Sequence, residues 1–204
     1  GYHRFSLVQW LLDREIDTVD AWIEPETPLD CPAFVRARFV RGAGERARYA
    51  QIDFTFVPRM AMPCEFWLDD FVEVVGERGV MWINQCDGAG DREIYRDIEL
   101  SSSGLFPPIV VFVDGKVKTY LDDMSLHERN WSSSFREGTR DMIRALVDDQ
   151  HVPRYSGEQA KMIKRCSIAA YLSAEEGREV SIDEVTSEAE TTGRARIATN
   201  FCNI

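Results

Sequence analysis

The chain has 204 residues and a formal net charge of −11, with 44% hydrophobic and 29% charged residues, a composition ordinary for soluble globular proteins. The acidic balance argues against a nucleic-acid partner, because binding to phosphates requires a basic surface. No apolar run reaches the roughly 18 residues that a membrane span needs. Five scattered cysteines without a Cys-x-x-Cys pair argue against a disulfide scaffold or a zinc site and favour a cytoplasmic protein.

The chain opens with a segment that predicts a short helix over residues 2–13. Phe5, Val8 and Leu12 recur at helical spacing, which is typical of a helix with one buried side.

Residues 16–121 predict a sheet. Alternating apolar residues indicate strands at 16–24, 35–39 and 50–56, and further strands are expected at 71–75, 80–83, 93–100, 109–113 and 116–121. Hairpin turns are expected at Gly42-Ala43-Gly44, at Gly76–Gly79 and at Asp114-Gly115. Asp-Gly suits a type I′ turn, which needs positive φ at both central residues.

After residue 121 the spacing of the apolar residues changes from a period of two to a period of 3.6, and residues 125–176 predict helices. Two segments, Ser125 to Glu128 and Ser134 to Glu137, match the capping-box pattern, in which a hydroxyl and a carboxylate satisfy main-chain N–H groups at a helix start. An apolar stripe follows the second box and consists of Phe135, Met142, Ile143, Leu146 and Val147.

The last predicted helix starts near Ser156 and ends at Gly177, with a buried side of small residues at Cys166, Ala169, Ala170 and Ser173. Residues 181–204 form an extension that is either a tail or a closing strand.

These elements predict an α+β fold: a large, mainly antiparallel open sheet with helices packed on one face. The other face remains available for oligomerisation, and aromatic residues such as Phe54, Phe56 and Trp82 favour a partner chain there over water.

Several residues are eligible for chemistry. His3 shares a helix side with Ser6 and Trp10, and an imidazole with a pKa near 6.5 is suited either to proton transfer or to a structural role. Three acidic pairs are expected to be solvent-exposed carboxylates at the ends of strands or helices, and not cation sites: Asp69-Asp70, Asp122-Asp123 and Asp148-Asp149.

Two segments carry a resemblance to a known family. The opening run 1–12, with His3 followed by Trp10-Leu11-Leu12, and the closing run 169–180 resemble the two ends of the C-terminal domain of the glucose–fructose oxidoreductase / inositol dehydrogenase (Gfo/Idh/MocA) family. The strand–turn–strand at 71–83 is similar to one in the same domain. The resemblance covers residues 3–180 and implies a substrate-binding and oligomerisation domain, 1–180, followed by the extension.

The resemblance implies an NAD- or NADP-dependent oxidoreductase that acts on a secondary alcohol of a sugar or polyol. His3 would handle the substrate hydroxyl proton. Ser6 and Asp13 depart from the family pattern, which usually has Asp and Gly there. Residues that would face the substrate, or else belong to the core, are Phe66, Trp67, Asn130, Trp131 and Phe135.

The cofactor would belong to an N-terminal nucleotide-binding domain outside this chain, since no Gly-x-Gly-x-x-Gly follows a strand here. The chain alone is therefore expected to bind no cofactor and to be inactive, and no metal site is expected. Two alternatives stay open. One is a stand-alone interaction module that oligomerises through the open sheet face, and the other is a ligand carrier without catalysis.

Overall fold

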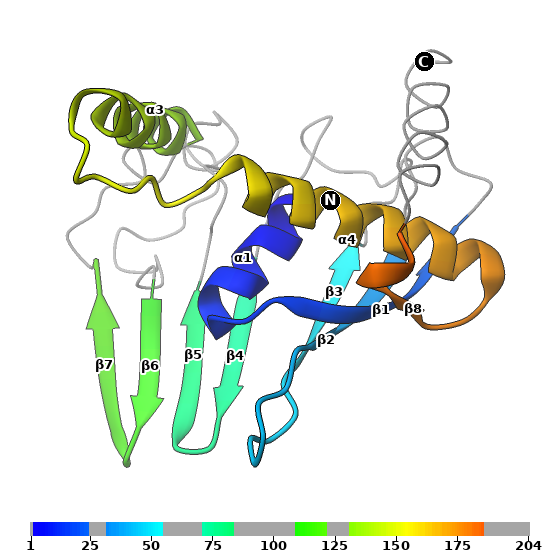
Figure 1. Ribbon diagram of the computed structural model, residues 1–204. Coiled ribbons are helices and arrows are strands. Elements are labelled where there is room, and N and C mark those ends of the chain that lie inside the picture. The colour runs from blue at the N-terminus through cyan, green and yellow to red at the C-terminus, as the bar shows by residue number, and fades with distance from the viewer. Residues whose placement is uncertain (1, 25–31, 55–70, 84–108, 122–130, 186–204) are drawn as a thin grey trace, which may run out of the picture. The chain divides into compact units, whose positions relative to one another are not determined.

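The computed structural model describes residues 2–24, 32–54, 71–83, 109–121 and 131–185 (Figure 1). They belong to two compact units, Gly1–Met60 with Tyr155–Ile204 and Ala61–Arg154. Each unit contains one antiparallel sheet of four strands. The predicted α+β class is confirmed, and the described strands are divided between two sheets.

The first unit holds sheet A, in which the strand order is β3-β2-β1-β8. Its elements are α1 (Tyr2–Leu12), β1 (Ile16–Ile23), β2 (Ala33–Phe39), β3 (Tyr49–Phe54), α4 (Gly157–Glu176), β8 (Val180–Ser181) and the short 3₁₀ helix η2 (Ile182–Glu184). Strand β2 alternates strictly between buried and exposed residues, which is the pattern of a strand with one face on the core. The register pairs Val35 with Ile52 and Val19 with Val180.

Helix α4 covers the buried face of sheet A, and its ends form as the sequence predicts. The Ser156 side chain accepts a hydrogen bond from the Gln159 main chain, and the Gln159 side chain accepts one from the Ser156 main chain. Gly177 ends the helix in the left-handed conformation, with φ 62°. Because glycine adopts positive φ without a steric cost, this residue allows the chain to turn directly into β8.

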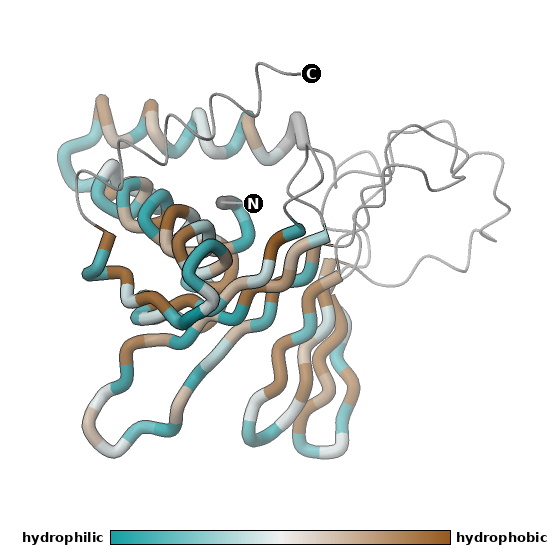
Figure 2. The backbone as a smooth tube through the Cα atoms, turned by 90° about the vertical axis from the view of Figure 1, so that its right-hand side faces the viewer, coloured by the Kyte–Doolittle hydropathy of each residue, from teal (hydrophilic) through white to brown (hydrophobic). Residues whose placement is uncertain are grey.

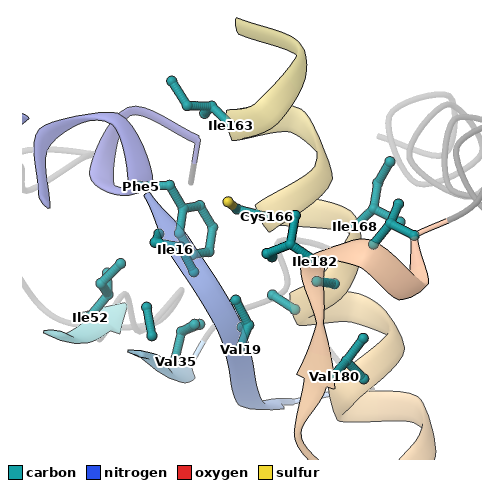
Figure 3. Packing of buried hydrophobic residues seen from close by; sticks show 14 of the residues in the cluster. Phe5, Ile16, Val19, Val35, Ile52, Ile163, Cys166, Ile168, Val180 and Ile182 are labelled. Atoms are coloured by element: carbon teal, nitrogen blue, oxygen red, sulfur yellow. The ribbon is translucent and has the colours of Figure 1, made fainter. Parts of the chain in front are cut away.

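The core of the first unit lies between sheet A, α4 and α1 (Figure 3). Phe5 of α1, Val19 of β1 and Cys166 of α4 are all buried in it. Burial raises the pKa of the Cys166 thiol to about 12, which keeps the thiol protonated and inert. Phe54, expected on the open face, instead packs against this core.

Ser173 is the one fully buried polar side chain among the described residues. Its Oγ donates to the Arg178 carbonyl at 2.6 Å and accepts from the Ala21 main-chain N–H at 2.8 Å. The hydroxyl therefore joins the C-terminal turn of α4 to strand β1. Both partners, the Ala21 N–H and the Arg178 carbonyl, are partly buried main-chain groups.

The second unit holds sheet B, in which the order is β4-β5-β6-β7. Its elements are β4 (Val72–Gly76), β5 (Gly79–Ile83), β6 (Ile109–Val113), β7 (Lys116–Tyr120) and α3 (Trp131–Val147). The turn between β6 and β7 has φ 50° at Asp114 and 70° at Gly115, which confirms the predicted positive-φ hairpin. Strand β6 is apolar throughout, whereas β7 contains two lysines and is exposed. Figure 2 shows hydrophobic and hydrophilic stretches of the chain by colour.

Helix α3 differs from the prediction in two ways. It begins at Trp131, so Ser134 lies inside the helix and does not cap it. The predicted apolar stripe is exposed in the described structure: Phe135 is 61% exposed, and Met142, Ile143, Leu146 and Val147 are also exposed. The predicted strand at 93–100 and the capping box at Ser125 lie outside the described residues.

Substitution of Gly79 by alanine is expected to disrupt sheet B. A Cβ at this position would lie 1.9 Å from the Phe112 carbonyl oxygen on the neighbouring strand, and main-chain atoms cannot move aside cheaply. We expect G79A to lower the free energy of unfolding of this unit by on the order of 3 kcal/mol, measured by urea denaturation. The control is G138A in α3, where the added Cβ meets nothing within 4 Å. It should stabilise the unit by about 0.5–1 kcal/mol, and equal effects of the two substitutions would contradict this packing.

Substitution of Ser173 by alanine is expected to weaken the first unit. Loss of the hydroxyl leaves the Ala21 N–H and the Arg178 carbonyl without this partner, at a cost of about 1–3 kcal/mol. The measurement is urea denaturation together with hydrogen exchange at the Ala21 amide. The control is S167A, because Ser167 bonds only to the Ile163 carbonyl of its own helix, and a change within about 0.5 kcal/mol is expected there. Unchanged exchange at Ala21 in S173A would contradict the role of Ser173.

Candidate functional site

Helix α1 carries His3, the predicted catalytic residue, and is fixed to the core by one side. Phe5 is 3% exposed, and Val8 and Leu12 pack against the same cluster. These positions are three and four residues apart, so they lie on one side of the helix. The predicted helical spacing is confirmed for these residues, whereas Trp10, which recurs at helical spacing with Leu7 and Leu11, is exposed.

The C-terminal end of α1 is held by two further hydrogen bonds. The Gln9 side chain accepts from the Ile16 main-chain N–H at 3.2 Å, and the Arg48 guanidinium donates to the Leu12 carbonyl at 2.6 Å. Arg48 thus ties α1 to the chain that leads into β3. The helix is connected to the sheet as well as packed against it.

The other side of α1 carries His3, Ser6 and Trp10. At 3.6 residues per turn these positions fall roughly opposite Phe5, Val8 and Leu12. His3 is exposed and Trp10 is 64% exposed, so this side presents an imidazole and an indole along one line. This is the candidate functional site.

The neutral form of His3, which can accept a proton, is favoured by its surroundings. Partial burial of the ring is the main cause that lowers the pKa of His3 below its ordinary value of 6.5, and the positive charge of Arg4 also lowers it. The imidazole is therefore mostly neutral at pH 7. A neutral imidazole has a lone pair available to take a proton from a hydroxyl group.

Tyr155 is a residue of this site that no sequence pattern predicted. Its hydroxyl is hydrogen-bonded to the Ser6 Oγ and also donates to the Ser6 carbonyl at 3.1 Å. The two residues are 149 positions apart. Neither periodicity nor any local motif connects them, so only the fold reveals this contact.

The described structure does not test the other predicted site residues. Phe66, Trp67 and Asn130 lie outside the described residues. Trp131 begins α3, and Phe135 is exposed on the same helix in the second unit. Their assignment to a substrate site stays a prediction.

The second described histidine, His151, has a structural role in the second unit. Its Nε2 lies 2.9 Å from the Asp141 Oδ1, and the Arg154 main-chain N–H donates to the Asp141 Oδ2 at 2.8 Å. The Arg154 N–H first, and then His151, lower the pKa of the Asp141 carboxyl. These bonds fasten the loop after α3 to the helix.

The described residues contain neither a dinucleotide cradle nor a metal cluster. Gly42-Ala43-Gly44 lies in the connection between antiparallel strands β2 and β3, whereas a phosphate-binding glycine loop joins a strand to a helix. No group of three or more His, Cys, Asp or Glu side chains in the described ranges has the arrangement to hold a metal ion. Asp148 and Asp149 are exposed. Within the same ranges, no helix is both long and apolar enough to cross a membrane.

Comparison with known proteins identifies a shared fold. No family model matches the sequence, and no curated protein is significantly similar to it. Among solved structures, the chain is similar to an oxidoreductase from Agrobacterium radiobacter crystallised with NAD+, L-tartaric acid and magnesium, with a TM-score of 0.61 and 16% sequence identity. The match covers 91% of this chain and 48% of that one. The chain thus has the fold of about half of that oxidoreductase.

Proposed function

We propose that this chain is the substrate-binding and oligomerisation domain of an NAD(P)-dependent oxidoreductase of the Gfo/Idh/MocA type. Its substrate would be a secondary alcohol of a sugar or polyol. The observation that carries the proposal is His3, a neutral imidazole on the exposed side of a helix that is anchored in the core. The shared fold with an NAD+-bound oxidoreductase supports it.

Oxidation of a secondary alcohol to a ketone removes a hydride from carbon and a proton from oxygen. A positioned base for the hydroxyl proton accelerates such reactions by about 10²- to 10⁴-fold. In the proposal, His3 accepts the hydroxyl proton in the oxidation and returns it in the reduction. The described residues do not fit a dinucleotide, so NAD or NADP would be held by an N-terminal nucleotide-binding domain, and the chain alone would be inactive.

The proposal makes a direct prediction about the encoding gene. We expect the reading frame upstream of the Gly1 codon to encode roughly 100–200 further residues, about one domain, with a Gly-rich turn after its first strand. The sequence of that region is the measurement. A start codon directly before the Gly1 codon would favour the rival function, a stand-alone interaction module without catalysis.

Substitution of His3 by asparagine is expected to remove the base in the extended protein. We expect H3N to lower kcat by about 10²- to 10⁴-fold and to abolish the loss of rate that protonation of His3 causes at low pH. Turnover is assayed with NAD and NADP against a panel of sugars and polyols. H151N is the matched control, because it removes an imidazole that bonds to Asp141 in the other unit, and its kcat should be largely unchanged. Full activity of H3N would refute the proposed role.

The outer face of sheet A supports self-association, as part of the same proposal or as the rival function. Trp22 and Phe34 stack there with ring centroids 5.7 Å apart, and they are 50% and 45% exposed. We call Trp22, Phe34 and the exposed Tyr49 the outer aromatic face. Its neighbours include the ion pair between Arg36 and Asp20, so apolar and balanced charged groups alternate as they do at many protein interfaces.

Charged substitutions on the outer aromatic face are expected to dissociate the assembly. W22E and F34E each place a carboxylate in the proposed contact, where burial of an unpaired charge is costly. Sedimentation velocity should show a smaller species for both variants than for the wild-type chain. V152E, at an exposed position of the other unit, is the control and should sediment as the wild type. A monomeric wild-type chain at high concentration would contradict self-association.

A further inference from the structure

The Tyr155 hydroxyl makes two hydrogen bonds to one residue of α1, Ser6. The Tyr155 Oη donates to the Ser6 carbonyl at 3.1 Å and is hydrogen-bonded to the Ser6 Oγ. Either hydroxyl can be the donor in the second bond. The pair therefore fixes both the main chain and the side chain of Ser6.

The main chain of Tyr155 is held next to the start of α4. It directly precedes Ser156, whose main-chain N–H donates to the Gln159 side chain at 2.7 Å and whose Oγ accepts from the Gln159 N–H at 3.2 Å. This capping box begins α4, the long helix that packs on sheet A. Tyr155 thus connects α1 to a rigid part of the same unit.

The start of α1 is the end of the helix that carries His3. The first four N–H groups of any helix lack partners within the helix, so a helix end frays more readily than its middle. Phe5 anchors one side of the first turn in the core. Since Ser6 projects about 100° further around the axis, a second anchor there fixes the rotation of the helix as well as its distance from the core.

His3 lies one turn before Ser6 on the same side of α1. Residues three apart on a helix have Cβ atoms about 5–6 Å from each other. A rotation or fraying of the first turn would therefore displace the imidazole, while the buried Phe5 tolerates some of that motion. The Ser6–Tyr155 pair limits it at the point closest to His3.

We infer that Tyr155 is a positioning residue for His3, because its hydroxyl bonds to Ser6 hold the first turns of α1 in a fixed rotation against the start of α4. Its consequence for turnover rests on the proposed function. Its consequence for the structure does not. Tyr155 acts through Ser6 and adds no charge near His3.

The first test uses the 204-residue chain and requires no turnover. In Y155F, which removes one oxygen atom, NMR should show main-chain amides of residues 6–10 exchanging about three- to tenfold faster, the expected effect of losing such hydrogen bonds. The titration midpoint of His3 should rise towards 6.5, because the ring loses part of the burial that lowers its pKa. The matched control is Y120F, at the exposed Tyr120 of β7 in the other unit, which should change neither quantity.

A second test separates the positioning role from a general loss of stability. S6A removes the Oγ bond but leaves the bond from Tyr155 to the Ser6 carbonyl, so it should show part of the Y155F effects on His3. The double variant should add little to Y155F, because both substitutions remove parts of one contact. In the extended enzyme, Y155F should lower kcat several-fold with little change in KM, and the low-pH limb of the rate profile should move upward with the His3 midpoint.

An unchanged His3 titration and unchanged α1 exchange in Y155F would overturn the inference, whatever the turnover assays show. Additive effects of S6A and Y155F would overturn it as well. Full activity of H3N would instead refute the proposed function and leave the NMR result standing. The failure of one idea is therefore distinguishable from the failure of the other.

Discussion

The close approach of α4 to sheet A is the constraint on which the first unit depends. The buried side of α4 carries the small side chains of Cys166, Ala169 and Ala170 next to Ser173, in addition to Ile163 and Ile168. The small residues let the helix axis lie near the strands, so that the Ser173 hydroxyl reaches the Ala21 N–H of β1. A longer side chain at any of these positions would hold the helix off and break that bond. Helix α1 packs on α4, so the position of His3 depends on this approach too.

Local features of the fold could be predicted because their causes are local. The capping box of Ser156 with Gln159 and the left-handed Gly177 each follow from residues within one turn of one another. The Asp114-Gly115 hairpin follows from the φ values that its turn requires.

Features that depend on distant segments could not be predicted in the same way. The Ser-x-x-Glu pattern at Ser134 failed, because these residues also occur inside helices and α3 starts earlier. Alternation placed Phe54 on a face of its strand, but only the position of α4 decides which face is the core. The contact of Tyr155 with Ser6 joins α1 to the residue that precedes the N-cap of α4, far away in the sequence. No pattern in a single sequence records such a pairing.

The residues around His3 favour its neutral form. A neutral imidazole is suited to accept a proton and not to donate one. A carboxylate at position 6 would stabilise the imidazolium and raise the pKa of His3. Ser6 and Tyr155 supply hydroxyl groups instead, and partial burial with nearby Arg4 disfavours the cation. In the proposed reaction the imidazole would enter as a proton acceptor, which is what the oxidation of an alcohol requires. The core side of α1 is occupied by Phe5, Val8 and Leu12, so the identity of residue 6 affects the chemistry of the outer side without disturbing the packing that holds the helix.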